Sequence, residues 1–200
     1  MATKKVSDYL MKKRNNTPMD LIVREYLADL RLRNLSGLTI KLYGAMLRGF
    51  MRTMAGKRET LRLAEVTPEL VRAYITGRMD QETIYEGHPM HPALAQRLSP
   101  HTIHREVRTL RSFGSWLTEQ ELDNPFGGLK LPKLPSRLIE ILDSDEVAKL
   151  FAIYNGDTQL GARWHAMFAF ALDTGVRISE LVGLKAGDLE IDHFRAKVWG

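Results

Sequence analysis

The chain has 200 residues, of which 44% are hydrophobic and 26% are charged, a balance typical of globular proteins. It contains no cysteine, which excludes disulfide bonds and thiolate metal sites and is compatible with a reducing cytoplasm. The longest apolar run, residues 164–172, is far shorter than a membrane span, and the N-terminus lacks the apolar region of a signal peptide, so we expect a soluble, cytoplasmic protein.

The net charge of +5 is distributed unevenly along the chain. Residues 1–135 contain 22 Lys and Arg against 14 Asp and Glu, a net charge of +8. Residues 136–200 contain 7 against 10, a net charge of −3. This asymmetry favours a basic module that binds a polyanion, joined to a module with another task. A merely solvated basic domain is the alternative.

Residues 1–16 are rich in lysine and predict a flexible basic arm. Four amphipathic helices are expected after it, because apolar residues recur at helical spacing behind recognisable start signals. These helices begin at Thr17 with Pro18, at Ser36, at Thr67 with Pro68, and at Ser99 with Pro100. The connection between the third and fourth helices, residues 80–98, carries two prolines and a glycine and is expected to be a surface loop.

Basic residues form stripes on two of these helices, away from the apolar positions. The second helix carries one such stripe and the fourth carries another, which makes the fourth the most basic amphipathic helix of the chain. The stripes consist of Lys41, Arg48 and Arg52, and of His101, Arg105, Arg108 and Arg111. Some of these arginines are expected to be solvated or to pair with Glu106.

The stretch DNPFGGLKLPKLPSR has three prolines and two glycines and predicts a linker between domains. After it, a helix is expected with Asp143 or Ser144 as its cap, followed by an apolar helix that Gly175 terminates. A short helix opening with Arg177 comes next, and the remaining residues alternate as in a β-hairpin.

Arg177 stands in an unusual position for a cation. A positive charge in the first turn of a helix is disfavoured by about 0.3–1 kcal/mol unless an anion compensates it. A guanidinium offers a planar fork of donors that matches two phosphate oxygens. Glu180, three residues later, lies on the same side of the helix and could hold the arginine in place. An ordinary surface ion pair is the alternative interpretation.

The stretch TGVRISELVGLKAGDLEID, residues 174–192, closely resembles the first catalytic box of the tyrosine recombinase, or phage integrase, family. In that family a T-G-x-R-x-S-E-L run precedes a short hairpin. The order of the upstream parts agrees, with a basic helical domain, a linker that contains Asn124 and Pro125, and a helix that opens with acidic residues. The resemblance covers residues 17–200, weakly in the helices and strongly in the box.

The resemblance implies a mainly α fold. It places a four-helix, SAM-like core-binding domain at residues 17–124, a linker at 125–137 and the N-terminal part of an α+β catalytic domain at 138–200. Residues 1–16 would precede these domains as an arm.

The resemblance also implies site-specific recombination, in which DNA is broken and rejoined through a 3′-phosphotyrosyl intermediate. Arg177 would contact the scissile phosphate and Glu180 would support it. Double-stranded DNA would be the partner, no cofactor or metal would be needed, and the full-length protein would assemble as a tetramer on two sites. Contacts to the DNA backbone are expected from Lys41, Arg48, Arg52, His101, Arg105, Arg108 and Arg111.

The sequence departs from the family pattern after the arginine. The family requires a later lysine, an H-x-x-R box and a tyrosine nucleophile, whereas the last tyrosine here, Tyr154, precedes Arg177 and no histidine is followed by arginine three positions on. We therefore expect a C-terminally truncated recombinase whose 200 residues bind DNA without cleaving it.

Three other interpretations are open. A non-catalytic protein could occupy recombination sites, and the stretch RISELVGLKAGDLE superficially resembles a helix-turn-helix regulator. Two H-x-x-H pairs, His88 with His91 and His101 with His104, raise the question of zinc. Four histidines without cysteine would be unusual for structural zinc, so no metal is expected.

Overall fold

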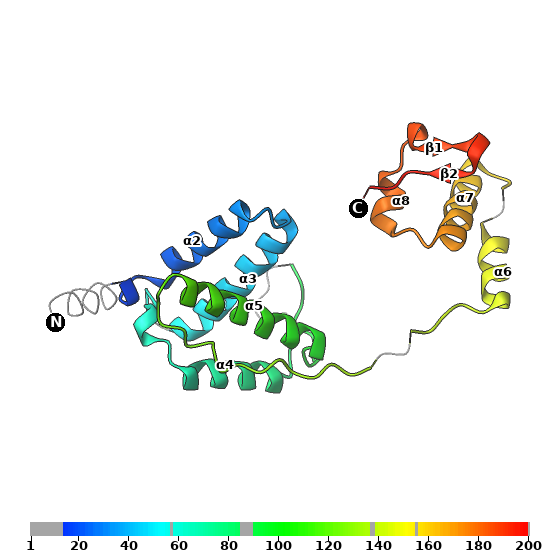
Figure 1. Ribbon diagram of the computed structural model, residues 1–200. Helices are drawn as coiled ribbons and strands as arrows, with labels where there is room; N and C mark the ends of the chain where they lie inside the picture. The colour runs from blue at the N-terminus through cyan, green and yellow to red at the C-terminus, as the bar shows by residue number, and fades with distance from the viewer. Residues whose placement is uncertain (1–13, 57, 85–89, 137–138, 155, 200) are drawn as a thin grey trace, which may run out of the picture. The chain divides into compact units, whose positions relative to one another are not determined.

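The computed structural model describes residues 14–56, 58–84, 90–136, 139–154 and 156–199. The chain divides into two compact units, which we call unit 1 (residues 1–136) and unit 2 (residues 137–200) (Figure 1). Helices dominate both units, and the described part of the chain holds a single two-stranded sheet. The mainly α fold class is therefore confirmed.

Among the described residues of unit 1, four long helices build the structure: α2 (Met19–Leu32), α3 (Gly37–Ala55), α4 (Pro68–Asp80) and α5 (Pro100–Glu119). The starts of the last three are set locally, as the sequence predicts. Ser36, Thr67 and Ser99 each cap a helix by accepting a hydrogen bond from the backbone N–H three residues later. A short 3₁₀ helix, Leu63–Glu65, precedes α4.

The start of α2 differs from the prediction. Thr17 does not cap the helix; Pro18 is the N-cap residue, and no side chain bonds to the first turn. Instead, the Met19 N–H donates to the Leu61 carbonyl at 2.8 Å within a short antiparallel bridge between Pro18 and Arg62. A backbone pairing between distant segments thus replaces the local cap.

The core of unit 1 is apolar and continuous, with α3 packed against α2, α4 and α5 (Figure 1). Aromatic rings join its parts: Phe50 lies 5.0 Å from Tyr74 of α4, and Tyr26 lies 5.2 Å from Phe113 of α5. Burial raises the pKa of both tyrosines to about 12, which keeps their phenols neutral.

The first part of the expected linker 125–137 packs on unit 1. Phe126 is fully buried, with its ring 5.6 Å from Phe50 and 5.7 Å from Phe113. Gly114 makes this approach possible, because a Cβ atom there would lie 2.9 Å from Cβ of Phe126. The segment is also held further along, where the Pro132 carbonyl lies 3.0 Å from Nδ1 of His104.

The end of the expected arm 1–16 is packed as well. The side chain of Asn15 is buried; it donates to the Asp123 carboxylate at 2.6 Å and accepts from the Asp123 N–H at 3.2 Å. These two bonds fix residues 14–16 against the end of α5. Residues 1–13 lie outside the described residues.

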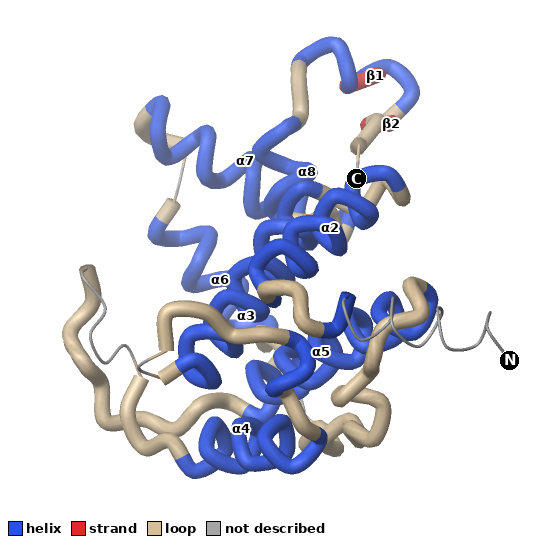
Figure 2. The backbone as a smooth tube through the Cα atoms, turned by 90° about the vertical axis from the view of Figure 1, so that its left-hand side faces the viewer, coloured by secondary structure: helices blue, strands red, loops and turns tan. Residues whose placement is uncertain are grey.

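The residues of unit 2 that the structure describes form three α-helices and a small hairpin (Figure 2). Its helices are α6 (Ser144–Ile153), α7 (Gln159–Thr174) and α8 (Ile178–Gly183), followed by the 3₁₀ helix Ala186–Asp188, strand β1 (Leu189–Glu190), the 3₁₀ turn Ile191–His193 and strand β2 (Arg195–Ala196). Asp143, rather than Ser144, caps α6 and forms a capping box with Glu146. The hairpin is antiparallel and pairs Leu189 with Ala196, as the alternation predicts.

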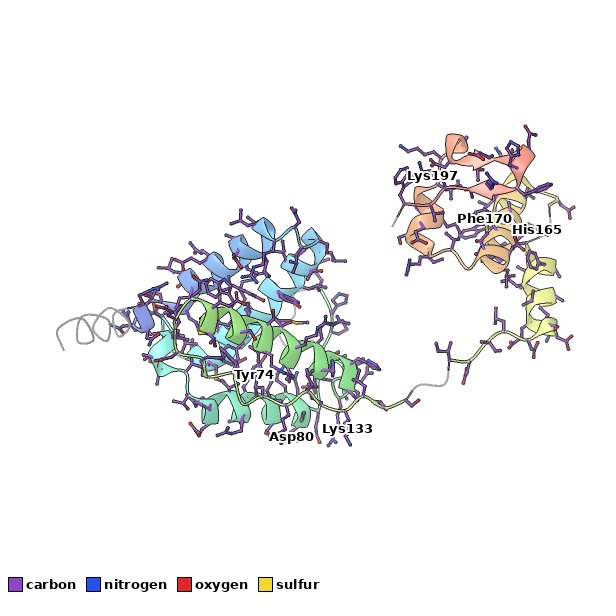
Figure 3. The ribbon with its side chains drawn as sticks, viewed as in Figure 1. Tyr74, Asp80, Lys133, His165, Phe170 and Lys197 are labelled. Carbon is purple, nitrogen blue, oxygen red and sulfur yellow. The ribbon has the colours of Figure 1, made fainter. Side chains whose placement is uncertain are left out.

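Apolar side chains of unit 2 remain accessible. Among its described residues none is buried, and Ile139, Ile178 and Phe194 are 85%, 75% and 98% exposed. Aromatic contacts near the surface hold its helices together. The half-buried ring of Phe151 of α6 lies 4.8 Å from the exposed ring of His165 of α7, which Figure 3 labels. Across the described ranges, no helix combines the length and apolarity that a bilayer span would need.

Candidate nucleic-acid interface and phosphate site

Arg177 lies at the junction between α7 and α8. Gly175 ends α7 with a φ of +64°, a left-handed conformation that favours glycine. Arg177 itself is extended, with φ −71° and ψ 150°, and is the N-cap residue of α8. The arginine therefore stands immediately before the first turn, not within it as the sequence predicts, because its backbone has not yet entered the helical region.

Glu180 holds both the backbone and the side chain of Arg177. One carboxylate oxygen accepts from the Arg177 N–H at 2.9 Å, and the other accepts from Nη1 of its guanidinium at 2.8 Å. The Glu180 side chain is 10% exposed, whereas that of Arg177 is 80% exposed. This geometry engages the backbone N–H and one terminal nitrogen of the guanidinium, and it leaves the rest of the exposed side chain open to a ligand.

The Thr174 hydroxyl orders the same junction. It donates to the Phe170 carbonyl at 2.6 Å and accepts a weak bond from the Val176 N–H at 3.4 Å. Thr174 thus links the end of α7 to the residues that lead into Arg177. In the sequence, the threonine-glycine pair at the end of the helix indicates that Thr174 could order this junction. It does not indicate which groups the hydroxyl bonds to.

The pKa of Glu180 lies below its ordinary value, first because the Arg177 N–H donates to it and then because the guanidinium does. Because the folded-state pKa is lowered, the two hydrogen bonds from Arg177 to Glu180 contribute their full stabilisation above the ordinary carboxyl pKa near 4.3. This contribution is lost as the pH falls through the lower folded value. Exchanging Arg177 for alanine should raise the pKa of Glu180 only part of the way, because the backbone donor remains. An NMR titration of the Glu180 carboxyl carbon in both proteins would measure this, and an equal pKa in both would contradict a guanidinium contribution.

The basic stripes of α3 and α5 share one property. All six arginine and lysine side chains that the sequence assigns to DNA are exposed, and none has an ion-pair partner among the described residues: Lys41, Arg48, Arg52, Arg105, Arg108 and Arg111. Other arginines of unit 1 are paired, including Arg24 with Asp20 and Arg72 with Glu69. Every lysine and arginine of α3 and α5 is therefore exposed and without an ion pair in the described part of the chain.

Glu106 does not neutralise the stripe of α5. It is buried, and its carboxylate accepts from Nε of Arg78 at 3.1 Å and from Nη2 at 2.6 Å. The expectation that Glu106 pairs with neighbouring arginines is wrong, because its side chain faces α4 instead of solvent. Tyr74 of α4 also donates to it, at 3.5 Å (Figure 3).

His101 differs from the other residues predicted to bind DNA. It is half-buried at the start of α5, and its Nε2 is inaccessible to solvent and has no hydrogen-bond partner in the described part of the chain. The surface of α5 therefore does not present this nitrogen. Of the remaining histidine pair, His88 lies outside the described residues.

The stripes and the arginine site lie in different units, and sequence comparisons cover both. A model of the phage integrase family matches residues 140–199. The tyrosine recombinase XerC of Bacillus pumilus is 32% identical over 161 residues, which cover 80% of this chain and 48% of that protein. XerC of Halalkalibacterium halodurans is 30% identical over 184 residues, or 90% of this chain and 55% of that protein. The chain spans about half the length of these curated relatives.

The fold is also shared with a solved structure. The integrase of the Tn1549 transposon, in complex with a circular intermediate DNA, superposes with a TM-score of 0.57 at 21% identity. The match covers 86% of this chain and 50% of the integrase. The family model and the sequence relatives show that the chain belongs to the phage integrase family of tyrosine recombinases.

Proposed function

We propose that the chain binds duplex DNA through α3 and α5 of unit 1 and uses Arg177 to bind the phosphate at which a tyrosine recombinase cuts. The observation that carries this proposal is that every lysine and arginine of α3 and α5 is exposed and has no ion-pair partner among the described residues. Cations that have no carboxylate partner are free to neutralise backbone phosphates, which supplies most of the affinity of nonspecific DNA binding.

The chemistry of Arg177 follows from its two hydrogen bonds to Glu180. With Nη1 held by Glu180, the remaining N–H groups of the guanidinium can donate to two nonbridging oxygens of one phosphate and stabilise the charge that develops on them during cleavage. Glu180 acts as a positioning residue, since its carboxylate contacts the arginine. The nucleophilic tyrosine of the family has no counterpart after Arg177 in these 200 residues, so we propose that they bind DNA without cleaving it.

Assembly as a tetramer on two DNA sites belongs to the proposal for a full-length protein. A second candidate, a non-catalytic protein that occupies recombination sites, rests on the same exposed cations of α3 and α5, which need no catalysis to bind DNA. Both candidates require duplex binding by unit 1, so binding and cleavage have to be measured separately.

The test compares the chain with its Arg177→Ala variant on duplex DNA. We expect affinities that agree within about threefold, because one exposed arginine outside unit 1 contributes at most one phosphate contact. Neither protein should yield a covalent phosphotyrosyl product in a single-turnover assay. Recovery of that product would overturn the prediction of binding without cleavage, and failure of both proteins to bind duplex DNA at low salt would overturn the proposed function.

A further inference from the structure

A groove runs between the C-terminal half of α2 and the N-terminal half of α3. It has a volume of about 490 Å³, and three cationic side chains line it: Arg31 from α2, and Lys41 and Arg48 from α3. No carboxylate lines this groove. None of the three cations has an ion-pair partner among the residues that the structure describes. The groove is therefore a concentration of positive charge without internal compensation.

Gly44 shapes the floor of this groove. A Cβ atom at this position would lie 3.1 Å from Nη1 of Arg48 and 3.1 Å from Cδ1 of Leu27. The guanidinium of Arg48 thus lies over the glycine, in the space that a side chain would take. Seven residues separate Lys41 from Arg48, so they recur on the same side of α3 with a rise of about 10 Å. That spacing allows the two cations to contact different phosphates of one strand.

We propose that this groove binds the phosphodiester backbone of duplex DNA, and that Arg31 is a DNA contact in addition to Lys41 and Arg48. The inference rests on the proposed function, since it extends the basic surface of α3 onto α2. Phosphate suits the groove because its oxygens match the planar donors of a guanidinium. Three uncompensated cations in one groove also favour a polyanion whose negative charges are spaced along a chain. On binding, the Arg31 side chain gains a charged partner, which it lacks among the described residues.

Arg24 provides a matched control, because it lies seven residues before Arg31 and so on the same side of α2. It is 75% exposed, pairs with Asp20 at 3.6 Å and does not line the groove. Arg31→Gln should weaken duplex binding by about fivefold to tenfold and reduce the slope of log affinity against log salt by about one. Arg24→Gln, with the same change in charge, should stay within about twofold.

The outcomes separate this inference from the proposed function. One comparison uses a variant of α5 in which glutamate replaces Arg105, Arg108 and Arg111. If Arg31→Gln behaves like Arg24→Gln while this charge reversal on α5 abolishes binding, the groove does not bind DNA and the proposed function stands. If charge reversal on α5 has no effect either, both fail.

A second measurement distinguishes backbone phosphate from other anions. In NMR titrations, duplex DNA should shift the Nε resonance of Arg31, whereas inorganic phosphate at constant ionic strength should leave it unchanged. A saturable shift with inorganic phosphate alone would assign the groove to the free ion and overturn the inference. If polyglutamate displaced duplex DNA from the groove as effectively as unlabelled duplex DNA does, the groove would be assigned to an acidic polypeptide and the inference would be overturned.

Discussion

Replacing Arg105, Arg108 and Arg111 with glutamate should weaken binding to duplex DNA by more than about 100-fold. All three are exposed on the outer face of α5, and none has a carboxylate partner in the described part of the chain. Each lost phosphate contact lowers the slope of log affinity against log salt by about 0.9, so the slope should become shallower by nearly three. Fluorescence anisotropy with a labelled duplex over a salt series would measure both quantities.

The control for this variant reverses three other arginines of unit 1. Arg24, Arg58 and Arg72 are 75%, 61% and 60% exposed, and each is ion-paired with a nearby carboxylate. Their replacement with glutamate changes the net charge by the same amount but leaves the stripes of α3 and α5 intact. We expect less than about a tenfold loss, due to the weaker long-range field. An equal loss in both variants would show that binding follows net charge and that the assignment to α5 is wrong.

Replacing Phe126 with alanine should destabilise unit 1 by about 3–5 kcal/mol. The ring is fully buried between Phe50 and Phe113, so its removal leaves a cavity where α3, α5 and the following segment meet. Because the chain has two units, a global melting curve would mix their transitions. Hydrogen exchange of the α5 amides reports on unit 1 alone and gives the free energy of its opening.

Leu134 is the matched control for Phe126. It is an apolar residue of the same segment, but it is 40% exposed. Leu134→Ala should change the opening free energy of α5 by less than about 0.5 kcal/mol, as surface substitutions usually do. Comparable losses in both variants would mean that the whole segment, rather than the Phe126 contact, stabilises unit 1.

Features that depend on neighbouring residues could be predicted from the sequence. The caps at Ser36, Thr67 and Ser99 need only a backbone N–H three residues later, and the prediction for each is confirmed. The clamp between Arg177 and Glu180 has the same local character, since spacing along one helix turn brings the two side chains together.

Features that depend on distant segments were missed or misassigned. The cap expected from Thr17 is replaced by pairing with Leu61, and Phe126 is buried although prolines and glycines around it indicate a linker. Sequence does not reveal that Glu106 faces Arg78 on α4. Nor does the sequence reveal that Arg31 has no ion-pair partner in the described part of the chain.

The hydrogen bonds between Asn15 and Asp123 have a consequence for the topology of unit 1. They join residues at the two ends of the four-helix unit, so the polypeptide enters the unit and completes its last helix at the same point. Unit 1 is therefore suited to circular permutation, with new termini in the connection between α4 and α5, and α5 would then precede α2 while its packing partners stayed the same.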